Sequence, residues 1–165
     1  MKELTEEEWI STTYDDSNKA VFGVKKNTTY YLKVTSVATK GCIKYTQTKV
    51  SEKSGKKKAK AVEIKKNKKI QGTIAAGDKK ADWYKIKVTK KGKVKLFTTG
   101  NASGYIYLQM YYANGKKFGS YVTVANRVYD SDKWVTNVKL NKGTYYIKVY
   151  RGNDKTSGNY TLKWK

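Results

Sequence analysis

The sequence contains no histidine and a single cysteine, and these two shortages exclude most catalytic and metal-binding designs. Without histidine there is no Ser-His-Asp or Cys-His nucleophile, no imidazole general base and no histidine-containing zinc site. Cys42 alone can form neither an intramolecular disulfide nor a cysteine zinc cluster. Asp130 and Asp132 are closely spaced acids, but residues 129–133 have the composition of a polar turn. We therefore expect a protein that is not an enzyme.

The chain also lacks a long apolar stretch and has very little arginine. No run approaches the roughly 20 apolar residues that cross a bilayer, and the mean hydropathy is -0.79, so no membrane insertion is expected. Arg127 and Arg151 are the only arginines among 36 basic residues. Base readout usually relies on the planar guanidinium group, which lysine lacks. Specific nucleic-acid recognition is therefore disfavoured.

The net charge is nevertheless +23, almost all of it from lysine. Such a charge concentrates anionic partners, for example an anionic wall polymer, a sulfated glycan or sialylated mucin. The same lysines can also simply solvate the outward faces of strands and protect sheet edges from aggregation. Charge alone leaves both interpretations open.

Short alternating segments rich in tyrosine and β-branched residues predict strands throughout the second part of the chain. The side chains expected on the buried faces are Tyr84, Ile86, Val88, Val94, Leu96, Ile106, Leu108, Met110, Tyr145, Ile147, Val149, Tyr160, Leu162 and Trp164. Trp134, Thr136, Val138 and Leu140 are expected to share one further face. The dipeptide Asn114-Gly115 is a type I′ hairpin signal, and residues 141–143 mark another tight connection. The predicted fold is all-β, an antiparallel, jelly-roll-like β-sandwich.

An internal repeat suggests two related units. Residues 24–34, VKKNTTYYLKV, are similar to residues 138–149, VKLNKGTYYIKV, with one residue inserted. The first copy has few residues ahead of it, so residues 1–50 are predicted to form a partial unit resembling the end of the second. Residues 51–58 are predicted to be a solvated linker, followed by a complete sandwich over residues 59–165. Alternatively, residues 1–50 add strands to one larger sandwich.

The order of residues resembles the bacterial pre-peptidase C-terminal (PPC) domain from about residue 59 to residue 165. The segments that carry the resemblance are residues 72–74 (GTI), 77–78 (GD), 82–86 (DWYKI), 112–116 (YANGK) and 142–149 (KGTYYIKV). The resemblance implies a non-catalytic, extracellular or cell-surface module of a bacterial protein, with neighbouring repeats in a longer chain. Some members bind calcium or large extracellular polymers. Calcium ligands carried over to this chain would be Glu63, Asp78 and Asp82.

A row of tyrosines is the main candidate for a ligand site. If Ile106 and its alternating neighbours point inward, then Tyr105, Tyr107 and Tyr111 point outward on one strand. Their rings can stack on sugars or bind protein, with Gln109 as a polar neighbour. They can equally pair across strands and serve only to cover the sheet.

The leading functional hypothesis is a module that binds an extracellular polysaccharide or a host extracellular protein such as mucin, a matrix protein or immunoglobulin. The alternative is a structural spacer with diffuse attraction to an anionic wall polymer, and a third possibility is an accessory domain of a secreted peptidase or glycosidase.

Overall fold

The computed structural model describes residues 21–32 and 44–165, and of residues 126–137 it describes the backbone only. The elements in chain order are η1 (Lys58–Lys60), β1 (Val62–Glu63), β2 (Lys69–Ile74), β3 (Asp82–Val88), β4 (Gly92–Tyr111), β5 (Lys117–Leu140), β6 (Gly143–Arg151) and β7 (Gly158–Trp164). Within the described ranges, no helix is long and apolar enough to span a membrane. The all-β prediction is confirmed.

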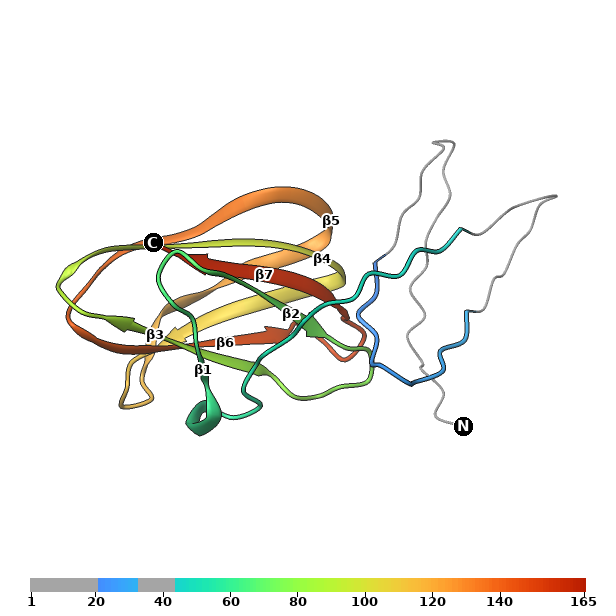
Figure 1. The fold of residues 1–165 in the computed structure, drawn as a ribbon, viewed down its shortest axis with the longest axis horizontal. Helices are drawn as coiled ribbons and strands as arrows, with labels where there is room; N and C mark the ends of the chain where they lie inside the picture. Colours follow the sequence, from blue (N-terminus) through green and yellow to red (C-terminus); the bar gives the residue numbers. More distant parts are fainter. Residues whose placement is uncertain (1–20, 33–43) are drawn as a thin grey trace.

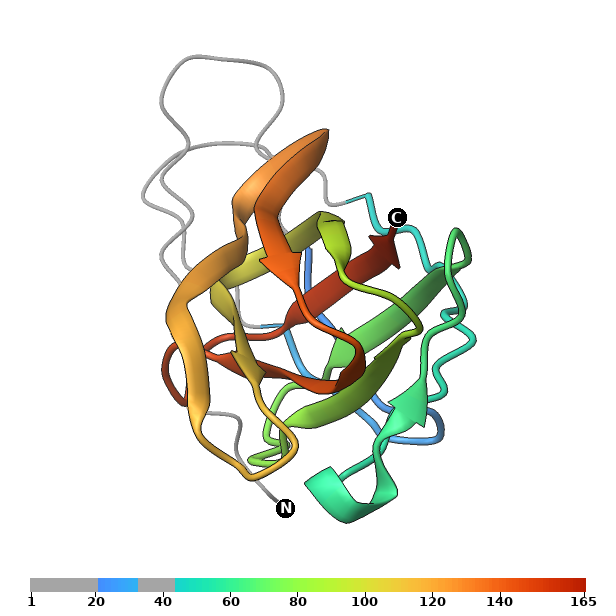
Figure 2. The same cartoon turned by 90° about the vertical axis from the view of Figure 1, so that its left-hand side faces the viewer.

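The strands form one continuous sheet that curls into two facing layers (Figures 1 and 2). The hydrogen-bonded order is β1-β3-β6-β4-β7-β2, and β5 pairs with β4. Strand β4 joins the layers because its first half pairs with β7 and its second half with β6. The pair β1–β3 is parallel, whereas the other pairs are antiparallel. The long hairpin of β4 and β5 therefore belongs to both layers.

Two turn predictions need correction. The β4–β5 hairpin is present, but only Gly115 in its turn has a positive φ, +90°, so the turn is not type I′. The turn instead closes with the Gly115 amide donating to the Tyr112 carbonyl at 3.0 Å. Residues 129–133, expected as a polar turn, lie inside β5. There, the register shifts from Gly100↔Tyr129 to Thr98↔Lys133, so the polar residues form a bulge rather than a chain reversal.

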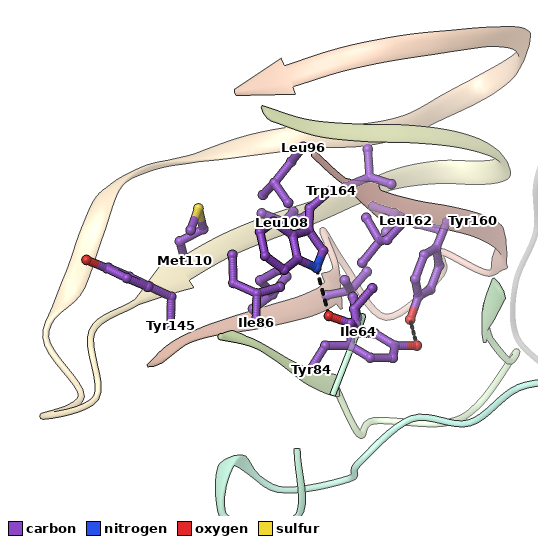
Figure 3. Packing of buried hydrophobic residues seen from close by; sticks show 14 of the residues in the cluster. Ile64, Tyr84, Ile86, Leu96, Leu108, Met110, Tyr145, Tyr160, Leu162 and Trp164 are labelled. Atoms are coloured by element: carbon purple, nitrogen blue, oxygen red, sulfur yellow. Dashed lines mark hydrogen bonds between the residues drawn. The ribbon is translucent and has the colours of Figure 1, made fainter. Parts of the chain in front are cut away.

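The core lies between the two layers, and the predicted alternation supplies it. The fourteen side chains expected on the buried faces are buried, joined by Ile64 and Ile74 from the edges. Of the further face, Leu140 is buried and Val138 is half-buried, and the side chains of Trp134 and Thr136 lie outside the described ones. Figure 3 shows two hydrogen bonds within this core: Trp164 Nε1 donates to the Ile64 carbonyl at 2.7 Å, and the hydroxyls of Tyr84 and Tyr160 lie 2.9 Å apart. Buried polar atoms need such partners because leaving them unpaired costs about 1–3 kcal/mol each.

The predicted partial unit falls mostly outside the described residues, since 1–20 and 33–43 are not described. Residues 21–32 and 44–50 contain no strand. Part of the segment contacts the sandwich: the Gly23 carbonyl accepts from the Ala76 amide at 2.8 Å, and Lys25 Nζ lies 3.6 Å from Asp78 Oδ2. Whether residues 1–50 form a related unit stays a prediction.

Residues 51–58 differ from the expected solvated linker. Gly55 is buried and forms an antiparallel bridge with Trp83, in which each amide donates to the other's carbonyl at 3.1 and 2.7 Å. Glu52 Oε2 accepts from the Thr73 amide at 3.1 Å. The lysine-rich composition conceals these contacts because backbone hydrogen bonds need no apolar side chain. We call residues 52–56 the strap, since they lie across the end of β2 and the start of β3.

Candidate functional site

The outer face of the layer β3-β6-β4 carries the largest group of aromatic side chains. Strand alternation places Trp83 on the side of β3 opposite the buried Tyr84, and it places Tyr150 on the side of β6 opposite Val149. The pairing of β4 with β6 sets Tyr107 directly across from Tyr150. Rings from separate strands therefore meet on one surface.

Six rings form this surface, which we call the aromatic face: Trp83, Tyr105, Tyr107, Tyr111, Tyr121 and Tyr150. Tyr107 lies at its centre, with ring centroids 5.9 Å from Tyr105, 4.7 Å from Tyr121 and 5.8 Å from Tyr150. Tyr105 and Tyr121 are 46% and 55% exposed, and the other four are half-buried. The rings support one another and still present area to solvent, as a preformed binding surface requires.

A lysine connects the two ends of the aromatic face. Lys148 on β6 pairs with both Trp83 and Gln109 in the sheet. Its Nζ lies 4.9 Å from the centroid of the Tyr150 ring and 5.9 Å from that of Trp83. Trp83 in turn contacts Tyr111, with centroids 5.4 Å apart. Cation–π attraction holds the ammonium group between the rings.

The structure brings the predicted tyrosines together but removes Gln109 from the site. Its side chain is only 3% exposed. Its Nε2 donates to the carbonyls of Met110, Phe118 and Gly119 at 2.9, 3.2 and 3.0 Å. These carbonyls lie at the register shift between Leu108 and Met110 of the β4–β5 pair, and the amide binds them instead of facing a ligand.

Gly152 has no side chain, which leaves room for Tyr105 and Tyr107 on the aromatic face. The Gly152 amide donates to the Tyr105 carbonyl at 2.7 Å. A Cβ at this position would lie 3.0 Å from both Tyr105 Cβ and Tyr107 Cε2. Any side chain larger than hydrogen would therefore push on two of the six rings.

The three carboxylates named as calcium ligands do not form one group. Glu63 Oε2 binds Lys87 Nζ at 2.8 Å, and Asp78 accepts from the Lys80 amide at 3.1 Å besides its contact with Lys25. Across the described part of the chain, no three Asp, Glu, Cys or His side chains are placed to hold a metal ion. Calcium needs six to eight oxygen ligands, so these residues do not fit it.

Asp82 is instead a buried carboxylate bound by three donors. Ser54 Oγ and Lys56 Nζ donate to Oδ1 at 2.8 and 2.7 Å, and Tyr160 Oη donates to Oδ2 at 2.6 Å. Lys56 also binds Glu52 Oε1 at 2.9 Å. Burial raises the pKa of Asp82, although the three donors oppose it. Desolvation lowers the pKa of Lys56, but its hydrogen bonds to Asp82 and Glu52 outweigh this and leave that pKa raised.

This network attaches the strap to the sandwich, which leads to a stability prediction. Replacing Lys56 with methionine leaves a buried charge with less compensation, and we expect a loss of about 1–2 kcal/mol at pH 7. The loss is smaller than for a fully buried pair because the Lys56 side chain is 43% exposed. Since Asp82 has a raised pKa in the folded state, folding takes up a proton at low pH. The penalty should therefore shrink as the pH is lowered from 7 and Asp82 becomes protonated, as measured by urea unfolding.

The matched control is Lys53→Met, which removes the same charge from the strap at an exposed residue. We expect it to change stability by less than about 0.5 kcal/mol. Equal losses in the two variants would contradict the role assigned to Lys56.

Sequence reasoning missed Trp83, Tyr121, Tyr150 and Lys148. The alternation already placed Trp83 and Tyr150 outward, opposite Tyr84 and Val149. What the sequence did not contain was the strand order that sets β6 between β3 and β4. Tyr121 lies inside the register irregularity between Phe118 and Val122, so simple alternation does not reveal its face.

Comparison with known proteins confirms the resemblance seen in the sequence. Residues 80–151 match the family model "Bacterial pre-peptidase C-terminal domain". Among solved structures, the pre-peptidase C-terminal domain of a collagenase from Bacillus anthracis aligns with a TM-score of 0.50 at 21% identity. The alignment covers 64% of this chain and 94% of that one. This likeness shows the fold.

Two further solved structures overlap less closely. A periplasmic inhibitor of g-type lysozyme from Salmonella Typhimurium aligns with a TM-score of 0.36 at 14% identity, over 64% of this chain and 98% of that one. A GH26-CBM35 β-(1,4)-mannanase from Podospora anserina aligns with a TM-score of 0.37 at 14% identity, over 58% of this chain and 28% of that one. A search of curated proteins finds no match.

Proposed function

We propose that this PPC-like domain is a non-catalytic binding module of an exported bacterial protein, and that its aromatic face binds an extracellular polymer. The aromatic face itself carries the proposal, because it gathers six rings from four strands, in two contacting groups bridged by Lys148, on one side of the sheet. Contiguous aromatic surface on a soluble domain commonly marks an interaction site. The likeness to a domain attached to a collagenase favours an accessory role.

The chemistry of the site suits binding rather than catalysis. The face offers flat rings, hydroxyls and an ammonium group, which hold sugars or extended proteins by stacking and hydrogen bonding. The buried acid nearest to it in sequence, Asp82, is saturated by Ser54, Lys56 and Tyr160 and so is not poised for proton transfer. An exported location follows from the family resemblance and is part of the proposal.

The aromatic face predicts a specific loss of binding on mutation. Tyr107 contacts three other rings, so Tyr107→Ala removes its own surface and loosens its neighbours. We expect affinity for the cognate polymer to fall about tenfold or more, equivalent to ~1.4 kcal/mol. The measurement is titration calorimetry, after retention on a panel of neutral and acidic glycans, collagen, mucin and immunoglobulin has selected the polymer.

The control variant is Phe97→Ala. Phe97 alternates with the buried Leu96 on the half of β4 that pairs with β7, so it lies on the other layer. Its removal should leave affinity within about twofold of the parent chain. If both variants bind as the parent does, the aromatic face is not the site.

The net charge of +23 supports a second function, a spacer that interacts diffusely with anionic wall polymers. Such binding would involve every polyanion tested and would disappear at about 0.5 M salt, where charges are screened beyond a few ångströms. Binding through stacked rings should persist at that salt concentration. The same panel, run at low and high salt, therefore separates the two functions.

A further inference from the structure

Ammonium groups lie in and around the aromatic face, and their positive charge limits the kinds of ligand that the face can bind. Lys148 lies between Trp83 and Tyr150, and Lys58 Nζ lies 4.7 Å from the centroid of the Tyr146 ring on the same side of β6. Lys85, which pairs with Tyr146, points to this side as well. The aromatic face is thus bordered by ammonium groups.

The structure describes five acidic side chains, and none of them forms an ion pair with Lys148. Four of the five bind other lysines: Glu52 and Asp82 bind Lys56, Glu63 binds Lys87, and Asp78 binds Lys25. The fifth, Asp154, is exposed in the loop after β6 and forms no ion pair with Lys148. Over residues 44–125 and 138–165, no carboxylate forms an ion pair with Lys148. The ammonium group is held by ring faces alone, which leaves its charge available to an incoming anion.

We infer that the ligand of the aromatic face is an acidic polysaccharide, an inference that rests on the proposed function. Its sugar rings stack on Trp83 and Tyr150, and its carboxylate or sulfate groups pair with Lys148 between them. Sugar rings have apolar C–H faces that fit aromatic surfaces. An anion placed over a half-buried ammonium group forms a stronger charge-assisted hydrogen bond than one in open water.

Lysine suits this ligand better than it suits a nucleic acid. A compact ammonium group on a flexible stem accepts a carboxylate or sulfate in many orientations, whereas phosphate and base recognition favours the planar arginine fork. Arg151, the arginine whose side chain the structure describes, donates from its Nη1 to the Asp154 carbonyl at 2.8 Å. Single-stranded nucleic acid, which also combines stacking with positive charge, is the competing ligand that the experiment must distinguish.

The experiment measures binding of the full chain to polygalacturonate, chondroitin sulfate, methyl-esterified polygalacturonate and oligo-dT. Methyl esterification keeps the sugar backbone and removes its charge. Titrations at about 0.15 and 0.5 M salt separate diffuse attraction from binding at the site. We expect at least one acidic polysaccharide to bind at both salt concentrations, and about tenfold more tightly than the methyl ester.

Two lysine variants with the same net charge test whether the ammonium group on the aromatic face, rather than the overall charge, strengthens binding of the acidic polymer. Lys148→Met removes the ammonium group from the aromatic face, and Lys95→Met removes one from an exposed position on the half of β4 that pairs with β7. We expect Lys148→Met to weaken binding of the acidic polymer about tenfold and to leave the weaker binding of the methyl ester unchanged. Lys95→Met should change neither by more than about twofold. Circular dichroism verifies that both variants fold.

Results that contradict the acidic ligand can be told apart from results that contradict the proposed function. Equal binding of acidic and esterified polymer, lost in Tyr107→Ala, would preserve the proposed function and overturn the acidic ligand. Equal effects of the two lysine variants, or tighter binding of oligo-dT than of either acidic polysaccharide, would also overturn it. Failure to bind any of the four polymers would overturn it too, and the wider panel would then decide the proposed function separately.

Discussion

Replacing Gly72 with alanine is expected to lower the free energy of unfolding by about 2–4 kcal/mol. Gly72 pairs with Tyr160 across β2 and β7. A Cβ at Gly72 would lie 2.3 Å from both Cζ and Oη of the Tyr160 side chain. The Tyr160 ring is buried and cannot move aside without losing its hydrogen bonds to Tyr84 and Asp82. One added methyl group therefore disrupts the polar network as well as the packing.

Gly92→Ala is the matched control for this prediction. Gly92 begins β4, and a Cβ there would come no closer than 4.0 Å to the nearest atom, the Lys90 carbonyl oxygen. We expect a change within about 0.5 kcal/mol, or slight stabilisation through the less flexible unfolded chain. Urea unfolding of both variants at neutral pH provides the comparison. Similar midpoints for the two would show that Tyr160 does not need the space at Gly72.

Above about pH 10, Tyr84 and Tyr160 together are expected to lower the free energy of unfolding by about 2.7 kcal/mol per pH unit. Burial raises the pKa of both phenols far above the value of about 10 that they have in the unfolded chain. The folded state therefore retains two protons that the unfolded state releases, and each contributes about 1.4 kcal/mol per unit. Lys56 acts in the same direction, because its raised pKa gives stability that is lost as the pH rises.

The net charge is +23, and deprotonation of surface lysines at high pH reduces the repulsion between them. This effect raises the free energy of unfolding and so opposes the effect of the tyrosines. The prediction is therefore tested on differences between variants. Between about pH 10 and 11.5, the free energy of unfolding of Tyr84→Phe should fall less steeply than that of the parent chain, by about 1.4 kcal/mol per pH unit. This holds whatever the stability of the variant at neutral pH. Tyr45→Phe, at a side chain that is 87% exposed, should leave the slope of the parent chain. Identical slopes in all three proteins would refute the argument from burial.

The sequence predicted the interior of this protein better than its outer surface. Alternation identifies buried positions such as Tyr84, Ile147 and Leu162 because one apolar face per strand is a local property. Alternation also accounts for the directions of the side chains in the segment Asp82-Trp83-Tyr84. Asp82 and Tyr84 point inward to meet the Tyr160 hydroxyl, while Trp83 points outward to the aromatic face.

What the sequence could not supply were contacts set by strand order and register. Tyr107 and Tyr150 are 43 residues apart and meet because β4 pairs with β6, which no local pattern encodes. Gln109 was expected at the ligand site, yet an irregular register turns its amide onto backbone carbonyls. The strap was misjudged for a related reason, since Gly55 binds through its backbone and its neighbours are lysines.

The docking of the strap has a consequence for how such a domain is inherited. A gene fragment starting at residue 59 would encode a β3 strand in which Asp82 has lost two of its three donors, Ser54 and Lys56. Duplication or transfer of the domain between genes would keep these donors only if the exchanged segment began ahead of Glu52. The lysine-rich stretch that composition presents as a spacer is therefore part of the segment that must be inherited together for Asp82 to keep all three donors.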